Sequence, residues 1–134
     1  MTYLFDASAI VNLVKKGRLL ILSKGSTLEL ALYESLNAVL KEYVLLKKLD
    51  HESAVDFVKI LSEIFGNIKT ESIRGLETEV FNLAAKFGLT IYDASYLLAA
   101  LNNNLTLVTD DSKLRSALKE ILPVKSTEEV IGKV

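Results

Sequence analysis

The hydrophobic and polar positions form their clearest pattern between Ala94 and Thr109, a stretch without any charged residue. In its first half, apolar residues recur at the i, i+3, i+4, i+7 spacing of a helix, at Ala94, Leu97, Leu98 and Leu101. Its second half, residues 105–109, is short, apolar and partly β-branched, as in an inner strand. Asparagines at 102–104 suit the turn between the two halves. We therefore predict a buried unit in which a helix leads into a strand.

Comparable patterns on both sides of this unit predict strands that alternate with helices. The predicted strands span residues 2–5, 27–31, 68–73, 105–109 and 124–126. The predicted helices span residues 7–16, 32–49, 51–65, 75–87, 94–101 and 112–121, with a last helical turn within 127–134. Residues 19–22 are apolar but fit neither period. The alternation predicts an α/β fold, a three-layer α/β/α sandwich with a mostly parallel central sheet.

Length and composition narrow the class of protein. A chain of 134 residues suits one domain, which we expect to span residues 1–134. Half of the residues are hydrophobic, but no apolar run approaches the ~20 residues that cross a membrane. The N-terminal residues 1–8 lack the basic and apolar regions of a secretory signal peptide. Together with the absence of cysteine, these features predict a cytoplasmic protein without a membrane-spanning segment.

The absence of cysteine also excludes disulfides, thiolate zinc sites and cysteine nucleophiles. The single histidine, His51, follows Asp50 at a predicted helix start, where a solvated first-turn residue is expected rather than a ligand. Any metal would therefore be a hard cation held by oxygen atoms, Mg²⁺ or Mn²⁺. The formal charge of −1 gives no general attraction to nucleic acid, so a phosphate partner would be met by local lysines and arginines or by bound cations.

Four aspartates lie at predicted strand or helix ends: Asp6, Asp93, Asp110 and Asp111. Parallel strands place their carboxyl ends at one edge of the sheet, where open α/β folds bind ligands. The acids near this edge also have purely structural interpretations. Asp93 stands in a capping-box pattern with Thr90, and Asp111 is placed to cap the following helix. Glu34 suits the first turn of its helix, where it complements the helix dipole.

Capping does not explain why several acids would meet at one edge of the sheet. Two carboxylates ~4 Å apart repel by about 4 kcal/mol at an effective dielectric constant of about 20. A group of three or four would be strongly destabilising unless a divalent cation neutralised it. Such a cation keeps positions open for water and a phosphate oxygen, which suits metal-assisted hydrolysis of a phosphodiester.

The sequence around these acids resembles the PIN-domain ribonucleases, in particular the VapC-like toxins of type II toxin–antitoxin systems. Four segments carry the resemblance, in order along essentially the whole chain: FDAS at residues 5–8, ESLN at 34–37, YDA at 92–94 and LVTDD at 107–111. The resemblance implies a PIN-like α/β/α nuclease whose acids hold Mg²⁺ or Mn²⁺ and which hydrolyses RNA. It also implies a homodimer and an antitoxin protein as a partner.

Matched by position, the resemblance implies that the catalytic acids and metal ligands are Asp6, Glu34, Asp93 and Asp111. The side chains that it implies as orienting these acids are Ser8, Asn37 and Thr109. The chain has two acids after Thr109 where the family often has one. Because side chains alternate along a strand, Asp111 would point to the same side as Thr109 and Asp110 to the opposite side. We therefore assign Asp111 to the site and Asp110 to an outer or solvent-facing role.

Other α/β proteins also place an aspartate after their first strand. A haloacid-dehalogenase-type phosphatase requires a second Asp two residues later, where this chain has Ser8, and a response-regulator receiver requires its acids in a different order. The main alternative to a nuclease is a PIN-like module that binds RNA or protein without cutting, because a fold and its site residues can outlive an activity. Cleavage of structured RNA that depends on a divalent metal distinguishes these two hypotheses.

Overall fold

The structure is a computed structural model that describes residues 1–132, and it is built on a sheet of five parallel strands. In chain order the strands are β1 (Tyr3–Phe5), β2 (Gly25–Leu28), β3 (Lys69–Glu71), β4 (Thr106–Val108) and β5 (Val124–Lys125). Their order across the sheet is β3-β2-β1-β4-β5, which puts β1 in the centre. The predicted α/β fold is confirmed. The sheet is wholly rather than mostly parallel.

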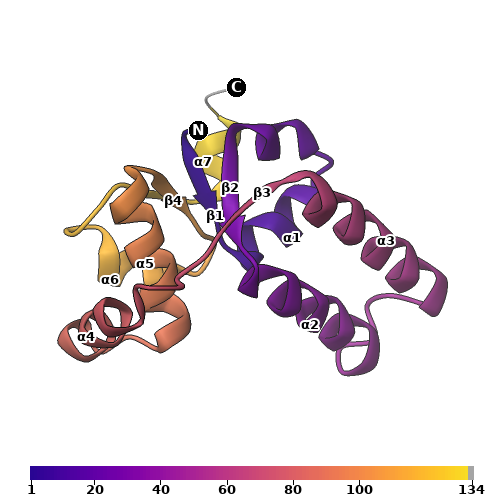
Figure 1. The fold of residues 1–134 in the computed structure, drawn as a ribbon. Helices are drawn as coiled ribbons and strands as arrows, with labels where there is room; N and C mark the ends of the chain where they lie inside the picture. The colour runs from indigo at the N-terminus through magenta and orange to yellow at the C-terminus, as the bar shows by residue number, and fades with distance from the viewer. Residues whose placement is uncertain (133–134) are drawn as a thin grey trace.

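Helices cover both faces of this sheet. They are α1 (Ala7–Lys15), α2 (Leu30–Val44), α3 (His51–Asn67), α4 (Glu77–Phe87), α5 (Ile91–Asn103), α6 (Ser112–Leu118) and α7 (Thr127–Ile131). Figure 1 shows α1, α2 and α3 on one side of the sheet and α4, α5 and α6 on the other. The predicted three-layer arrangement is therefore confirmed. Between residues 1 and 132, no helix has the length and apolar character needed to span a membrane.

The strand register brings the candidate site residues to one edge of the sheet. Phe5, the last residue of β1, pairs with Thr27 of β2 and with Val108 of β4. Asp6 and Thr109, which follow β1 and β4, therefore leave the sheet side by side. Helices that connect parallel strands run antiparallel to them, so α2 and α5 begin at this same edge. Glu34 and Asp93 lie near those two helix starts.

One strand lies earlier in the chain than the sequence pattern predicts. We predicted a turn at residues 24–26 and a strand at 27–31, whereas β2 spans Gly25–Leu28 and α2 begins at Leu30. All of β2 is buried, although it contains Ser26 and Thr27. Thr27 Oγ1 donates a hydrogen bond to the Phe5 carbonyl oxygen at 2.6 Å. The prediction was wrong because buried polar residues in an inner strand look like a turn in the sequence.

Some helix boundaries also differ from the predicted ones. Helix α2 ends at Val44 instead of continuing to residue 49, and the chain then turns through Lys47, whose φ is 51°. Residues that fitted neither period lie in a 3₁₀ helix, Leu19–Lys24. Helix α7 begins at Thr127, as predicted, and Ser126 caps it in a capping box with Glu129. Its predicted extension to residues 133 and 134 lies outside the described residues.

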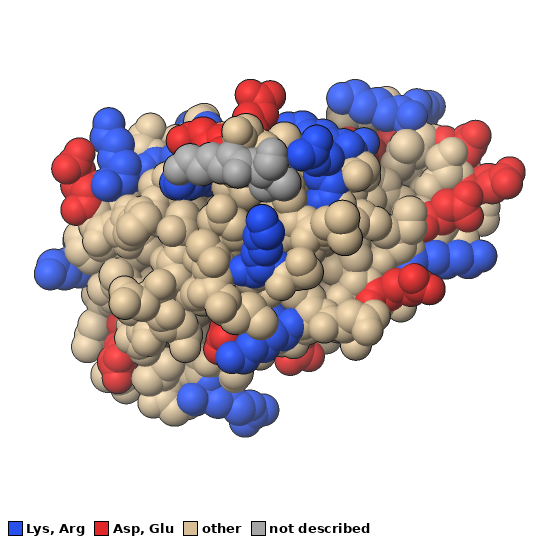
Figure 2. Space-filling view, turned by 90° about the horizontal axis from the view of Figure 1, so that it is seen from above, with Lys and Arg blue, Asp and Glu red and all other residues tan. Residues whose placement is uncertain are grey.

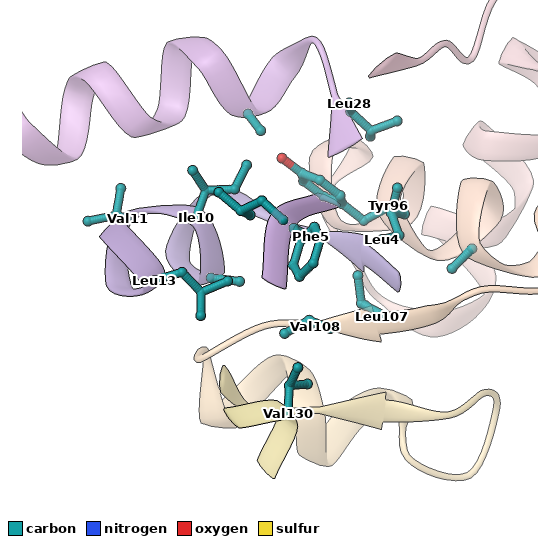
Figure 3. Close-up of a cluster of buried hydrophobic side chains, with 14 of the residues drawn as sticks. Leu4, Phe5, Ile10, Val11, Leu13, Leu28, Tyr96, Leu107, Val108 and Val130 are labelled. Carbon is teal, nitrogen blue, oxygen red and sulfur yellow. The ribbon is translucent and has the colours of Figure 1, made fainter. Parts of the chain in front are cut away.

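The main hydrophobic core surrounds the two central strands. β1 and β4 contribute Leu4, Phe5, Leu107 and Val108, which have no exposed surface. Figure 3 shows these side chains beside Ile10 of α1 and Tyr96 of α5. A smaller cluster joins α4 to α5 through Val80, Ala84, Ala94 and Leu98. Asp6 and Thr109 therefore follow directly on fully buried strand residues, Phe5 and Val108.

Gly25 is needed for the close contact between β2 and β1. A Cβ atom at this position would lie 2.3 Å from the Tyr3 carbonyl oxygen and 2.7 Å from the Phe5 ring. We expect Gly25→Ala to lower the free energy of unfolding by about 2 kcal/mol or more, because neither the central backbone nor a fully buried ring can move away. Gly66→Ala is the matched control, since its Cβ would meet nothing within 4 Å. Urea denaturation measures both, and equal stability of Gly25→Ala and wild type would contradict the prediction.

Candidate active site

Asp6 is the most buried of the four candidate acids, with 7% of its surface exposed. It is the N-cap of α1, and its Oδ1 atom accepts hydrogen bonds from the Ala9 amide at 2.9 Å and from the Ser8 hydroxyl at 2.7 Å. Burial raises the pKa of Asp6 to about 6, although hydrogen bonds from Thr109, Ser8 and Ala9 oppose the shift. The charge of Glu34 raises the pKa further. The protein thus holds a carboxylate where its charge is unfavourable without a cation.

Glu34 lies on the first turns of α2 and is half-buried. Its Oε1 atom accepts a hydrogen bond from the Tyr96 hydroxyl of α5 at 2.8 Å. Burial raises the pKa of Glu34, the bond from Tyr96 opposes that shift, and the charge of Asp93 adds to it. Glu34 is therefore electrostatically coupled to acids on two other elements, Asp6 after β1 and Asp93 on α5.

Asp93 lies in the first turn of α5, which Thr90 caps by accepting a hydrogen bond from the Asp93 amide at 3.0 Å. The reciprocal bond of a capping box, from the Thr90 amide to the Asp93 carboxylate, is not among the hydrogen bonds of residues 1–132. Burial raises the pKa of Asp93, the negative charge of Asp111 raises it further, and a hydrogen bond from the Thr90 side chain opposes the shift. The cap of α5 therefore involves the Asp93 carboxylate as well as its amide, but the carboxylate keeps acceptor positions for another role.

Asp111 does have the capping role that its position suggested. Its Oδ1 atom accepts hydrogen bonds from the amides of Lys113 at 3.0 Å and Leu114 at 3.1 Å, at the start of α6. The side chain is nevertheless exposed and near enough to Asp93 to raise the pKa of that acid. One carboxylate oxygen is used in the cap, and the other makes no hydrogen bond within residues 1–132. Capping and ligand binding are therefore compatible at this residue.

Asp110 points away from these acids. It accepts hydrogen bonds from the Asn12 side chain at 2.6 Å, the Thr127 amide at 2.8 Å and the Thr127 hydroxyl at 2.7 Å. Burial acts to raise the pKa of Asp110, but these bonds and the charge of Lys16 together lower it. Asp110 and Asp111 thus have different partners, as the alternation of side chains predicts. Asp110 is not turned to solvent, because it ties α1 to the start of α7.

The polar side chains predicted to orient the acids are only partly brought together. Ser8 donates to Asp6 and accepts from the Asp110 amide at 2.9 Å, and its hydroxyl is 3.3 Å from that of Thr109. Thr109 is fully buried and accepts from the Asp111 amide at 3.1 Å. Asn37 lies on α2 close to Glu34 in sequence, but it is exposed and has no hydrogen bond within the described residues.

Tyr96 is the site residue that sequence reasoning missed. It lies three residues after Asp93, so the two residues share one face of α5. Only 2% of Tyr96 is exposed, and its hydroxyl belongs to an otherwise apolar side of the helix. A hydroxyl at a core position requires a hydrogen-bond partner, and this requirement was the available clue. The partner itself, Glu34, is distant in sequence and could be found only in the folded structure.

The four acids form a chain of repulsions from Asp6 through Glu34 and Asp93 to Asp111. None of the ion pairs found within residues 1–132 includes any of them. As they stand, no three His, Cys, Asp or Glu side chains of that range are close enough together to hold a metal ion. The donor chemistry nevertheless fits Mg²⁺ or Mn²⁺, because every member offers a carboxylate oxygen and no basic side chain offsets the charge.

Comparison with known proteins shows which family the chain resembles. The family model described as the PIN domain matches residues 3–119. A protein named exonuclease VapC9, from Pyrobaculum aerophilum, is 33% identical over 130 residues, which cover 92% of this chain and 91% of that protein. Ribonuclease VapC3 of the same organism is 34% identical over 88 residues, which cover 66% of each chain. Both relatives therefore bear names of nucleases.

The fold is also found among solved structures. The crystal structure of PAE2754 from Pyrobaculum aerophilum superposes with a TM-score of 0.79 at 28% sequence identity. The superposition covers 99% of this chain and 94% of that one. The resemblance seen in the sequence is thus confirmed by a family model, by related sequences and by a solved fold. The chain belongs to the PIN-domain family and is homologous to its VapC nucleases.

Proposed function

We propose that this PIN-domain protein is a VapC-like toxin that acts as a metal-dependent endoribonuclease. It hydrolyses RNA phosphodiester bonds with Mg²⁺ or Mn²⁺ held by Asp6, Glu34, Asp93 and Asp111. The observation that supports this most directly is the set of carboxylates from four elements, of which three have their pKa raised first by burial and further by a neighbouring acid. A divalent cation converts that unfavourable charge into binding energy. The nuclease names of both relatives agree with the proposal.

The other polar residues support this set in two ways. Ser8 and Thr109 hold Asp6 in place through their hydroxyls, while Asp110 holds the segment after β4 by binding α1 and α7. Asn37 is left to contact the substrate or the water around the cation. When bound, the cation polarises a phosphate oxygen and lowers the pKa of an attacking water.

The RNA must be held by local contacts, because the surface offers no general attraction. The formal net charge is −1. Figure 2 shows, on the side of the molecule seen from above Figure 1, Lys and Arg side chains interspersed with Asp and Glu. Long-range electrostatic steering of a polyanion is therefore weak. Recognition would then depend on the acid-bound cation and on the structure of the RNA near the cut.

Endonucleolytic cleavage is tested with the same structured RNA in linear and in covalently closed circular form. An endoribonuclease opens the circle, whereas an exonuclease digests only the linear form. We expect both forms to be cut with Mn²⁺ and neither with EDTA. A circle that survives while the linear RNA is digested would assign exonuclease activity instead. If neither RNA is cut although both bind, the protein is the non-catalytic module.

We expect Mn²⁺ to raise the melting temperature of the metal-free protein in proportion to the logarithm of its concentration. The reason is that the proposed site needs the four acids of the folded chain, so Mn²⁺ binds the folded state and not the unfolded one. Mn²⁺ at a hundredfold excess over its Kd then stabilises the folded state by about 2.7 kcal/mol. Thermal melting after dialysis against EDTA measures the effect, with Ca²⁺ expected to stabilise without supporting cleavage. A folded protein whose melting ignores millimolar Mn²⁺ would count against the metal site.

The protein partner that we propose is an antitoxin, which would pack into an apolar groove between α2 and α3. Two adjoining hollows form this groove, and they share Leu36 and Val58. The exposed apolar residues on α2 and just after its end are Leu40, Val44, Leu45 and Leu46. On a small protein, exposed apolar side chains gathered beside an apolar groove indicate an interaction site. Co-expression with the protein encoded beside it, followed by affinity purification, tests the proposal.

We further propose that the protein works in the cytoplasm as a homodimer. A second apolar area lies on α4 and at both ends of α5, away from the groove, and its exposed members are Phe81, Phe87, Ile91, Tyr92 and Leu101. Since α4 and α5 pack on each other, this area is presented by one structural unit. The molar mass from light scattering during size-exclusion chromatography tests it: we expect about twice the 14.8 kDa of the chain.

A further inference from the structure

We propose that Tyr96 is a positioning residue for the metal site, whose hydroxyl holds Oε1 of Glu34 and leaves Oε2 to bind the cation. The inference rests on the proposed function, because it takes Glu34 to be a metal ligand. Tyr96 donates to Glu34 Oε1 at 2.8 Å. Within residues 1–132 this is the one hydrogen bond made by the Glu34 carboxylate, so Oε2 has no protein donor. Tyr96 would thus act on the metal through Glu34 and not by touching it.

The two partners differ in how firmly the fold holds them. The Tyr96 ring is 2% exposed and lies within the main core. Figure 3 shows its hydroxyl oxygen at the end of the ring that reaches toward α2. Glu34 is half-buried and has three rotatable side-chain bonds, so it would otherwise move freely. Packing fixes the Tyr96 ring, and its hydrogen bond therefore orders the Glu34 side chain, which packing leaves mobile.

The position of Tyr96 also links two of the proposed ligands. Asp93 and Tyr96 lie one turn apart on α5, while Glu34 lies on α2. A bond from Tyr96 to Glu34 therefore sets the spacing between the helices that carry two acids. Packing alone does not require the hydroxyl, since the residues around Tyr96 on the buried face of α5 are mainly Ala and Leu. Phenylalanine would fill the same volume without this bond.

The first experiment compares Mn²⁺ binding by wild type and Tyr96→Phe with isothermal titration calorimetry. We expect the Kd for Mn²⁺ to rise about tenfold, because removing a group that orients a metal ligand weakens affinity by about 10- to 100-fold. Tyr43→Phe is the matched control, because it removes a tyrosine hydroxyl from α2 and keeps the ring beside His51. In the cleavage assay, the Mn²⁺ concentration for half-maximal rate should rise by the same factor, while the rate at saturating Mn²⁺ changes much less.

A double-mutant cycle separates a positioning role from a general structural one. If Tyr96 acts through Glu34, then Tyr96→Phe should have no further effect on Mn²⁺ affinity in a Glu34→Gln background. A structural role would weaken binding equally in both backgrounds. Circular dichroism and urea denaturation of each metal-free variant show whether it is folded. An undiminished effect of Tyr96→Phe in the Glu34→Gln background would overturn the inference.

The outcomes also separate this inference from the proposed function. Wild type that binds Mn²⁺ and cuts RNA, with Tyr96→Phe binding equally well, overturns the positioning role alone. Wild type that neither binds Mn²⁺ nor cuts RNA overturns both. If Tyr96→Phe does not fold, nuclear magnetic resonance of wild type decides: the ring signals of Tyr96 should shift on addition of Mg²⁺ with the midpoint seen by calorimetry. Ring signals that do not move would reject the proposal.

Discussion

Asp6→Asn is expected to abolish metal-dependent RNA cleavage, by at least about a hundredfold, and also to make the metal-free protein more stable at pH 7. Cleavage falls because the proposed ligand at the end of β1 loses its charge. Stability rises because the folded protein buries that charge, which raises the pKa of Asp6 from 3.8 to about 6. Asparagine keeps the N-cap of α1, since its side-chain oxygen accepts from the Ala9 amide as well.

The pH dependence of this effect follows from the direction of the shift. An acid whose folded pKa is raised destabilises the fold fully above the folded pKa and not at all below the unfolded pKa. Asp6 thus makes metal-free wild type lose stability as pH rises from about 4 to about 6. The difference between Asp6→Asn and wild type should grow over this range to about 3 kcal/mol, at about 1.4 kcal/mol per pKa unit. Urea denaturation between pH 3.5 and pH 7 measures the difference. A variant less stable than wild type at pH 7 would contradict the burial argument.

Asp110→Ala is expected to lose mainly stability, whereas Asp111→Ala is expected to lose mainly RNA cleavage. Asp110→Ala removes the acceptor for three hydrogen bonds from Asn12 and Thr127, so we expect it to lower the free energy of unfolding by about 2 kcal/mol. The loss stays moderate because water can reach part of this site. Cleavage per folded molecule should fall by less than about tenfold, since Asp110 points away from the other acids.

Asp111→Ala should lower cleavage by at least about tenfold, because it removes a proposed ligand, and should lower stability by only about 1 kcal/mol through the lost cap of α6. Asp111→Asn is the matched control, as it keeps the capping oxygen and removes the charge. It should therefore restore stability without restoring cleavage. Mn²⁺-dependent cleavage and urea denaturation of all three variants provide the measurements. If Asp110→Ala were the variant that loses cleavage, the assignment of Asp111 would be wrong.

Local sequence patterns were sufficient to predict features, such as helix ends, that depend on residues close together in the chain. Asp50 caps α3 by accepting from the Ser53 amide, at the predicted helix start, and α4 ends at the predicted residue 87, where Gly88 follows with a φ of 65°. The order of strands and helices followed in the same way. The pattern failed at β2, because the period of apolar residues gives no indication that Ser26 and Thr27 are buried.

Contacts between distant segments could not be read from the sequence. Asp110 was expected to face outward because alternation separates it from Asp111, but its partners, Asn12 and Thr127, belong to helices at opposite ends of the chain. Tyr96 was missed for the same reason, since its partner Glu34 lies 62 residues earlier. That Asp6 and Thr109 leave the sheet side by side could be anticipated, because the carboxyl ends of parallel strands always share an edge. Their exact partners depend on side-chain packing in three dimensions.

The hydrogen bonds around Ser8 can run in only one direction. A serine hydroxyl has a single proton, and Ser8 gives it to Asp6 while accepting from the Asp110 amide. The Thr109 hydroxyl, whose oxygen lies 3.3 Å from that of Ser8 and accepts from the Asp111 amide, likewise gives its single proton to Asp6. Every dipole in this relay is oriented from the segment after β4 toward the carboxylate at the end of β1. The hydroxyls and the amide around Asp6 are therefore oriented so that its carboxylate only accepts hydrogen bonds, which is what the proposed role as a metal ligand requires.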